Sequence, residues 1–426
     1  MNQNLVPKWT KIEHFTFRSF ALYLILYFLF YSGSFEYSRF EILRDVSIPF
    51  QKTIIGLTSL VNNLFIHKQF PGYHNNADHY FTFIGELTLL IIAVVAALIW
   101  TVADKGKSFP SFRKYIYVLA RYNLCYNLIY YGISKIDGIQ FGLVPSSLIP
   151  TIGSKNAYGL FWTFMSVSKS YAFFGGLLET IAGVLLLFRR TSRLGSLIAI
   201  PVIINVLMLN LGYDVPKKLE LLHLILCGIL ILIPDLKKLF QIIILNQTAS
   251  LSPSLPPLIE NKKYYWVQWL VKFSIIGYFL FTMLKDESDV YNSVYHSPYQ
   301  KIIGIYDVNG FYFNQQLKQP LYTDSVGWKK IAVDPYGLQI QFMNDSVAYF
   351  GLYVDTLNRT FALNTWRDTA FKATLHYTEN KSGELVFVGT FKTDSVHFTS
   401  NKIDMYNLPL LKRYGKIKWL WEGNNN

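Results

Sequence analysis

The stretch "FFGGLLETIAGVLLLFRRTSRLGSLIAI", residues 173–200, decides the fold class that the sequence predicts. Two apolar runs lie on either side of a short basic turn that contains Arg189, Arg190 and Arg193. A helix that crosses the hydrocarbon core of a bilayer requires about 20 mostly apolar residues. The two runs, 171–188 and 194–213, are close to this length, so the sequence predicts two membrane-spanning helices joined by a basic loop.

Similar runs recur along the first two thirds of the chain. The seven expected spans are 17–34, 80–102, 113–135, 171–188, 194–213, 218–234 and 266–285. Some of them have only about 17 residues, the lower limit for a span, so the count is uncertain by one. Segment 48–66 is apolar on one side, which indicates an interfacial or re-entrant helix. Segment 236–246 is expected to lie along the membrane surface.

Composition agrees with a membrane protein. Of the 426 residues, 51% are hydrophobic and only 16% are charged, whereas a soluble domain of this size would be more highly charged. The net charge of +13 comes from residues 1–285, which contain 26 Lys and Arg against 13 Asp and Glu. Residues 286–426 contain 14 of each and no basic stripe with interleaved aromatics, so no nucleic-acid partner is expected.

Basic residues also predict the orientation in the membrane, because cytoplasmic loops are enriched in Lys and Arg. With the N-terminus inside, the inner loops carry fourteen basic residues and the longer outer loops carry eight. We therefore expect a multi-pass protein of the bacterial cytoplasmic membrane with its N-terminus in the cytoplasm. An odd number of spans then places the C-terminal domain in the periplasm, and an even number would reverse this.

After residue 290 the hydrophobic pattern changes to period two, which is typical of strands. Alternating segments at 337–343, 347–354, 371–378, 384–391 and 395–400 predict a small antiparallel barrel or sandwich. The sequence thus predicts an α-helical polytopic membrane bundle followed by an all-β extracytoplasmic domain. The expected divisions are an N-terminal span with an interfacial helix (1–75), a membrane bundle (76–240), a linker with the last span (241–290) and the β-domain (291–426).

Polar residues inside the expected spans fall on defined helix faces. Arg121, Cys125, Leu128, Gly132 and Lys135 follow one another at helical spacing and share one stripe. Ionisable residues within a bilayer are costly and therefore face the bundle interior or water.

Three further spans carry such positions. Glu179 lies on a stripe of small residues that would let another helix approach closely. Asn210 and Asp214 share a face, as do Glu220, His223 and Cys227.

These positions predict a polar pocket that opens outward. Lys135 and Glu179 are the candidate catalytic residues and the expected charge pair, and the candidate substrate-binding residues are Arg121, Asn210, Asp214 and His223. Structural explanations remain open, since Lys135 can snorkel at a helix end and Glu179 can hold helices together. Paired CxxC, HExxH and G-x-S-x-G motifs are absent, and no metal site is expected.

The segments "ARYNLCYNLIYYGISKIDGIQF" and "INVLMLNLGYDVPKKLELLHLIL", together with the stretch quoted first, resemble the DoxX-like membrane protein family. The similarity covers roughly residues 75–240 and is greatest to the large members of Bacteroidetes-type bacteria. The matching polar and glycine positions are Arg121, Gly132, Lys135, Glu179, Asn205, Asn210, Tyr213, Asp214 and Lys217.

The resemblance implies a four-helix core and a redox-linked role, because the family is named after a subunit of a thiosulfate:quinone oxidoreductase. It implies a quinone as the bound group, although no cofactor motif is evident in the residues themselves. Three functions stay open: a membrane redox protein that binds a quinone or a small acid, a non-catalytic platform whose residues 291–426 contact an envelope protein, and a transporter of a small anion. Whether the chain is an enzyme is therefore undecided by the sequence.

Overall fold

The computed structural model describes residues 10–30, 41–68, 78–104, 110–251, 264–335, 337–365, 372–380, 384–412 and 414–415. The chain divides into two compact units. The first comprises Met1–Gly132 and Leu178–Thr282, and the second comprises Ile133–Leu177 and Met283–Asn426. Segment 133–177, which the sequence alone grouped with the membrane bundle, thus belongs with the C-terminal strands.

Ten α-helices are found in the described residues. Their bounds are α1 Lys11–Phe30, α3 Glu41–Val61, α4 Tyr80–Ala103, α5 Pro110–Ile136, α6 Ala157–Val167, α7 Lys169–Leu187, α8 Ser192–Gly212, α9 Lys218–Leu232, α10 Leu236–Ile243 and α11 Tyr265–Tyr295. A π-helical turn, Asn62–Ile66, extends α3, and a 3₁₀ turn, Ile233–Asp235, joins α9 to α10.

Four helical stretches are long and apolar enough to cross a membrane: Tyr80–Ala103, Lys169–Leu187, Ser192–Gly212 and Lys218–Ile243. They confirm four of the seven expected runs as apolar helices of spanning length. The runs 17–30, 113–135 and 266–285 are helical as well, but their crossing of a membrane stays a prediction. Residues 31–34 and part of the predicted linker lie outside the described residues.

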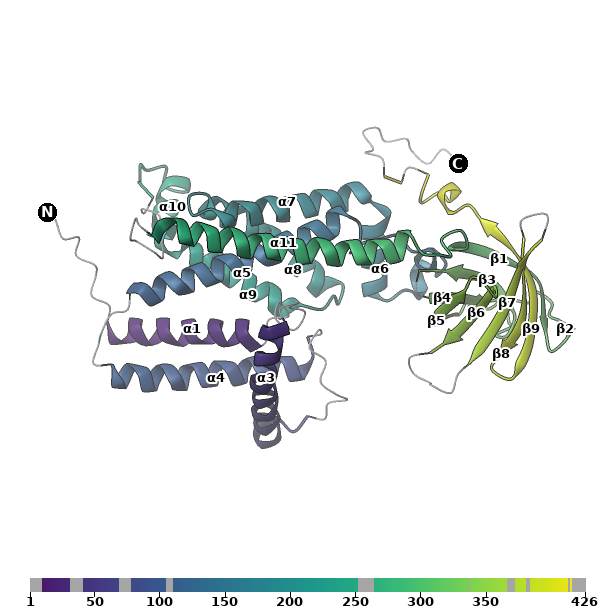
Figure 1. Ribbon diagram of the computed structural model, residues 1–426, viewed down its shortest axis with the longest axis horizontal. Helices are drawn as coiled ribbons and strands as arrows, with labels where there is room; N and C mark the ends of the chain where they lie inside the picture. Colours follow the sequence, from purple (N-terminus) through teal and green to yellow (C-terminus); the bar gives the residue numbers. More distant parts are fainter. Residues whose placement is uncertain are drawn as a thin grey trace. The chain divides into compact units, whose positions relative to one another are not determined.

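The two helices expected to lie at the membrane surface are also present. The expected helix at 48–66 begins earlier, at Glu41, and in Figure 1 it crosses α1 and α4. The helix expected at 236–246 is α10. The positions of both relative to a bilayer stay predictions.

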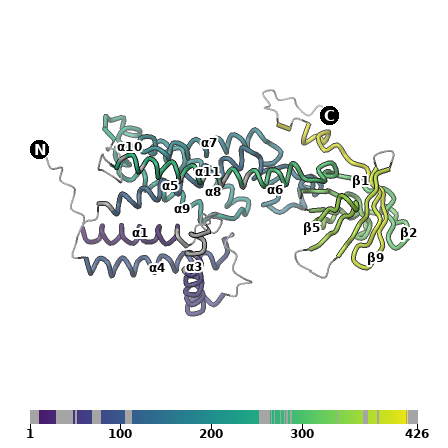
Figure 2. The backbone as a smooth tube through the Cα atoms, viewed as in Figure 1, coloured from purple at the N-terminus to yellow at the C-terminus, as the bar shows by residue number. Residues whose placement is uncertain are grey.

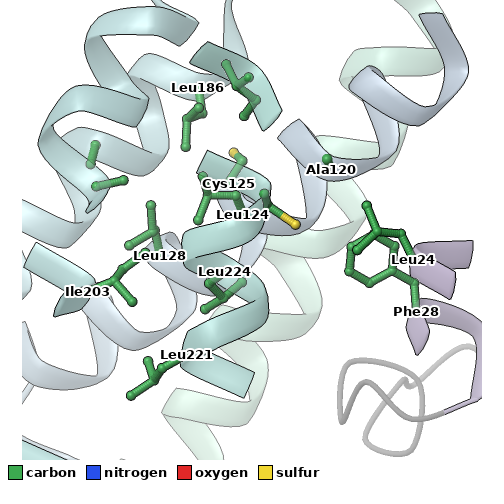
Figure 3. Packing of buried hydrophobic residues seen from close by; sticks show 14 of the residues in the cluster. Leu24, Phe28, Ala120, Leu124, Cys125, Leu128, Leu186, Ile203, Leu221 and Leu224 are labelled. Atoms are coloured by element: carbon green, nitrogen blue, oxygen red, sulfur yellow. The ribbon is translucent and has the colours of Figure 1, made fainter. Parts of the chain in front are cut away.

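Helices of the first unit pack around one apolar interior. Figure 2 shows α1 and α4 side by side in opposite directions, and Arg18 on α1 forms an ion pair with Asp104 just after α4. Figure 3 shows side chains from α1, α5, α7, α8 and α9 in this interior, among them Leu24, Leu124 and Leu221.

One helix contact depends on glycine, as the stripe of small residues predicted. A Cβ placed on Gly183 of α7 would lie 2.7 Å from Ile129 Cγ1 and 3.1 Å from the Cys125 carbonyl oxygen, both on α5. The missing side chain therefore allows α5 and α7 to approach closely.

The second unit contains a closed antiparallel barrel. Its strands are β1 Gly304–Phe313, β2 Gln316–Leu317, β3 Trp328–Val333, β4 Gly337–Phe342, β5 Val347–Asp355, β6 Thr360–Asn364, β7 Ala373–Glu379, β8 Leu385–Phe391 and β9 Asp394–Ile403. Neighbours pair in the order β2-β1-β3-β4-β5-β6-β7-β8-β9, and β1 also pairs with β9, which closes the sheet (Figure 1). The barrel alternative of the prediction is confirmed, with each of the five expected strands present.

Aromatic side chains fill the barrel. Phe387 on β8 faces Phe398 on β9 with ring centroids 4.9 Å apart, and Phe361 lies 5.4 Å from Phe387. All three side chains are fully buried. The barrel interior is thus a packed hydrophobic core.

Segment 133–177 packs on the outside of this barrel. Ile149 forms a small apolar cluster with Ile305 of β1 and Ala332 of β3. The Ser146 N–H donates a hydrogen bond to Asp334, directly after β3, over 3.0 Å.

Candidate functional site

The turn between α8 and α9 positions the polar end of α9. Asn210 on α8 donates from its side chain to the Pro216 carbonyl over 2.8 Å. Asp214 and Lys217 have positive φ angles of 53° and 77°, which fold the chain back sharply.

Asp78, just before α4, then caps the first turn of α9. Its carboxylate accepts hydrogen bonds from the Lys218 N–H over 2.8 Å and the Leu219 N–H over 3.3 Å. Free N–H groups at a helix start require such acceptors, so this contact fixes the position of α9.

His223, one turn further along α9, lies at the centre of a buried polar group. Its Nδ1 lies 2.7 Å from the Leu219 carbonyl oxygen, which can only accept, so Nδ1 carries the proton in the neutral ring. Nε2 is then the acceptor for the Tyr23 hydroxyl of α1, 2.6 Å away. The Tyr27 ring stacks on the imidazole at 3.7 Å between centroids and 4° between planes.

A carboxylate completes this arrangement. Glu86 Oε2 of α4 lies 4.0 Å from His223 Nε2, and the Glu86 side chain is only 12% exposed. We call Tyr23, Tyr27, Glu86 and His223 the tyrosine–histidine cluster. It joins α1, α4 and α9 inside the first unit.

A second polar group lies beside the cluster, because Glu220 and His223 are three residues apart on α9 and share a face. The Tyr131 hydroxyl of α5 donates to Glu220 Oε1 over 2.9 Å, and Lys217 Nζ donates to the Tyr131 oxygen over 2.6 Å. The Lys217 side chain is 39% exposed, whereas that of His223 is 5% exposed. Polar groups therefore extend from an accessible ammonium to a buried imidazole.

The chemistry of these groups is proton exchange and hydrogen bonding. An imidazole that accepts a hydrogen bond from a phenol at Nε2, with a carboxyl group 4.0 Å away, can exchange a proton with these groups. A phenol and an ammonium are donors suited to a ligand carbonyl or carboxylate oxygen. Among the described residues, no group of three His, Cys, Asp or Glu side chains could hold a metal ion.

The predicted site residues have different surroundings. Of the six, only His223 lies in the tyrosine–histidine cluster. Asn210 is 6% exposed and is used in the turn before α9, whereas the Asp214 side chain is 91% exposed and pairs with Lys218 over 3.2 Å.

Lys135 and Glu179 are both buried, at 7% and 4% exposure, which agrees with their prediction as interior residues. Lys135 belongs to the second compact unit and Glu179 to the first. Their pairing stays a prediction. Arg121 is 3% exposed and lies on α5, ten residues before Tyr131.

The contribution of α1 to the cluster was missing from the predicted site. Tyr23 and Tyr27 are four residues apart, so both face the same side of that helix. In a chain with 30 tyrosines, this spacing is too common to single them out.

Comparison with known proteins finds a relative whose sequence is matched over most of its length. The chain is 33% identical over 127 residues to the uncharacterized protein YwoB of Bacillus subtilis (strain 168). The match covers 30% of this chain and 81% of YwoB. No protein-family profile and no solved structure matches the chain.

Proposed function

Because the chain belongs to the same family as the uncharacterized protein YwoB, whose name gives no activity, we propose a function from the site chemistry. The protein is a DoxX-like, redox-linked membrane protein that binds a quinone headgroup or a small acid at the tyrosine–histidine cluster. The single observation that carries this proposal is the buried contact of His223 Nε2 with the Tyr23 hydroxyl at 2.6 Å, with Glu86 at 4.0 Å.

The hydroxyl, ammonium and imidazole groups described above suit such a ligand, because they can donate hydrogen bonds to its oxygen atoms. When bound, a quinone would take up two electrons and two protons from two thiols, which become a disulfide. His223 takes a proton at Nε2 and passes it on, and the Glu86 carboxyl group is the neighbouring group that can exchange this proton. Lys217 and Tyr131 orient a ligand oxygen from the accessible side.

The membrane arrangement is part of the proposal. The protein crosses the bacterial cytoplasmic membrane seven times, with its N-terminus in the cytoplasm and the barrel in the periplasm. The bias of basic residues toward alternate loops supports this orientation. An alkaline phosphatase fused to the C-terminus should be active, whereas an inactive fusion would reverse the orientation.

The test uses full-length protein purified in detergent. Extraction and mass spectrometry should recover a quinone from the wild type and at least tenfold less from His223→Gln. Tyr80→Phe is the matched control, because it changes an exposed side chain of α4 and should leave the quinone in place. Equal recovery from His223→Gln and wild type would refute the proposal.

The alternative function is a non-catalytic platform that holds an envelope protein through residues 291–426. The packed barrel favours it, because a filled interior leaves the outer surface for binding. Exposed aromatics on that surface include Tyr353 of β5 at 70%. Tyr353→Asp should then abolish the binding of the envelope protein, while His223→Gln leaves this binding intact. The opposite result supports the redox proposal.

A further inference from the structure

Arg121 is a buried cation with unused hydrogen-bonding capacity. The residue is 3% exposed, and in the part of the chain that the structure describes neither Nε nor Nη1 has a hydrogen-bond partner. Nε carries one N–H and Nη1 carries two, and an arginine cannot lose its charge in a protein. The Tyr122 side chain is hydrogen-bonded to Arg121, but the N–H groups on Nε and Nη1 stay without an acceptor among the described residues. Buried donors without an acceptor are costly, so the geometry calls for a further one.

Other arginines of the same unit have such an acceptor. Arg18 pairs with Asp104, and Arg193 Nε lies 2.5 Å from Asp235 Oδ2. Arg121 instead has an aromatic neighbour, because its guanidinium carbon lies 4.7 Å from the centre of the Tyr122 ring. The aromatic face attracts the charge but accepts none of the free N–H groups in a strong hydrogen bond.

Two further basic side chains, Lys272 and Arg189, belong to the same electrostatic environment as Arg121. Lys272 of α11 donates from Nζ to the Leu187 carbonyl at the end of α7 over 2.7 Å. The positive charges of Arg121 and Arg189 both act on this ammonium. Three cations that share one region repel each other unless an anion lies among them.

The surface beside these cations is apolar. Phe188, Leu270 and Phe273 are 44%, 58% and 55% exposed, and Lys272 Nζ lies 4.8 Å from the centre of the Phe188 ring. In a bundle with helices of membrane-spanning length, such side chains suit contact with acyl chains. Basic sites between membrane helices bind anionic lipid headgroups, in which phosphate oxygens accept from Arg and Lys.

We propose that Arg121, Arg189 and Lys272 form a binding site for the phosphate of an anionic phospholipid headgroup. This site is separate from the tyrosine–histidine cluster and its neighbours. Arg121 and Tyr131 are ten residues apart on α5, which corresponds to about 15 Å along the helix axis. The proposal does not depend on the proposed function.

Native mass spectrometry of the full-length protein with added phosphatidylglycerol tests the site. Arg121→Gln and Lys272→Gln should each lower the lipid-bound fraction at least fivefold. Arg190→Gln is the matched control, because it removes a neighbouring cation whose residue is exposed, and it should bind like the wild type. Arg121→Lys keeps the charge and should retain part of the binding, which separates loss of the site from loss of the fold.

Two further ligands distinguish binding of a lipid phosphate from binding of a free phosphate ion. Phosphatidylcholine, which has a phosphate but no net charge, should bind at least tenfold more weakly than phosphatidylglycerol. Inorganic phosphate at millimolar concentration should not displace the bound lipid. Unchanged lipid binding in Arg121→Gln and Lys272→Gln overturns the proposal, as does displacement by inorganic phosphate, which would assign the site to a free anion.

Discussion

The buried carboxylate of Asp334 accepts a hydrogen bond from the Ser146 N–H over 3.0 Å, across 188 residues of the chain. Asp334 is 3% exposed and directly follows β3. The contact holds the segment between α5 and α6 against the barrel. Because the carboxyl group is buried, its ionisation also makes the stability of the second unit depend on pH.

Asp334→Asn should remove a pH dependence of the stability of the second unit. Burial raises the pKa of Asp334 from 3.8 to about 6, so the folded state binds its proton more tightly than the unfolded state. The free energy of unfolding should therefore fall by about 3 kcal/mol as the pH rises from about 4 to 6, and stay level above that. Hydrogen exchange of peptides from β3 and β4 at several pH values measures it. A slope that persists in Asp334→Asn would contradict this assignment.

Phe387→Ala should destabilise the barrel by about 3–5 kcal/mol, because it leaves a cavity among fully buried rings. Val388→Ala is the matched control, since its neighbour Val388 is 52% exposed and faces outward on the same strand. Urea unfolding followed by hydrogen exchange of β8 and β9 compares the two. Similar losses for both variants would show that the barrel interior is loosely packed.

Gly183→Ala should destabilise the first unit by about 1–3 kcal/mol, because its Cβ would lie 2.7 Å from Ile129 Cγ1. Gly175→Ala on the same helix is the control. No described atom lies within 4 Å of the Cβ position there, so the higher helix propensity of alanine should be neutral or stabilising. Thermal unfolding in detergent measures both, and an equal melting temperature for the two variants would contradict the close contact.

Tyr23→Phe should cost about 1–3 kcal/mol, because it leaves His223 Nε2 buried without its hydroxyl donor. The stacked Tyr27 ring stays in place, so the change is confined to one hydrogen bond. The chemical shifts of the His223 ring nitrogens in a ¹⁵N-histidine-labelled sample report it directly. Spectra that are identical in wild type and variant would mean that this hydrogen bond is absent.

Lys135→Met and Glu179→Gln should each abolish quinone-dependent thiol oxidation in vesicles at unchanged protein levels, if these residues act with the ligand. Unchanged turnover in both single variants would leave them with structural roles alone.

The helical part of the fold could be predicted, because the length of an apolar run can be read from consecutive residues alone. The run 194–213 and the observed Ser192–Gly212 differ by two residues at most. Only some strands of the barrel could be predicted from the sequence. One reason is that β3 is buried on both faces over Ala332 and Val333. Val333 points into the barrel core, whereas Ala332 is covered by Ile149, so the alternation that marks a half-exposed strand is lost.

The candidate site was predicted less well than the fold. His223 could be identified from its spacing to Glu220 and Cys227 on one helix face. Its partners Tyr23 and Glu86 lie 200 and 137 residues earlier in the chain, on α1 and α4. Helical periodicity tells which residues share a face, but it does not tell which faces of different helices meet.

The pairing of β1 with β9 sets an order for biogenesis. Ile305 pairs with Ile403, so the sheet cannot close until Ile403 has been synthesised. Segment 133–177 emerges from the ribosome long before the strands that cover Ile149. Until then its apolar side chains have to be shielded by the bilayer or by a chaperone, because exposed apolar segments of nascent chains aggregate. Synthesis of β9 therefore completes a unit whose first part, segment 133–177, was made much earlier.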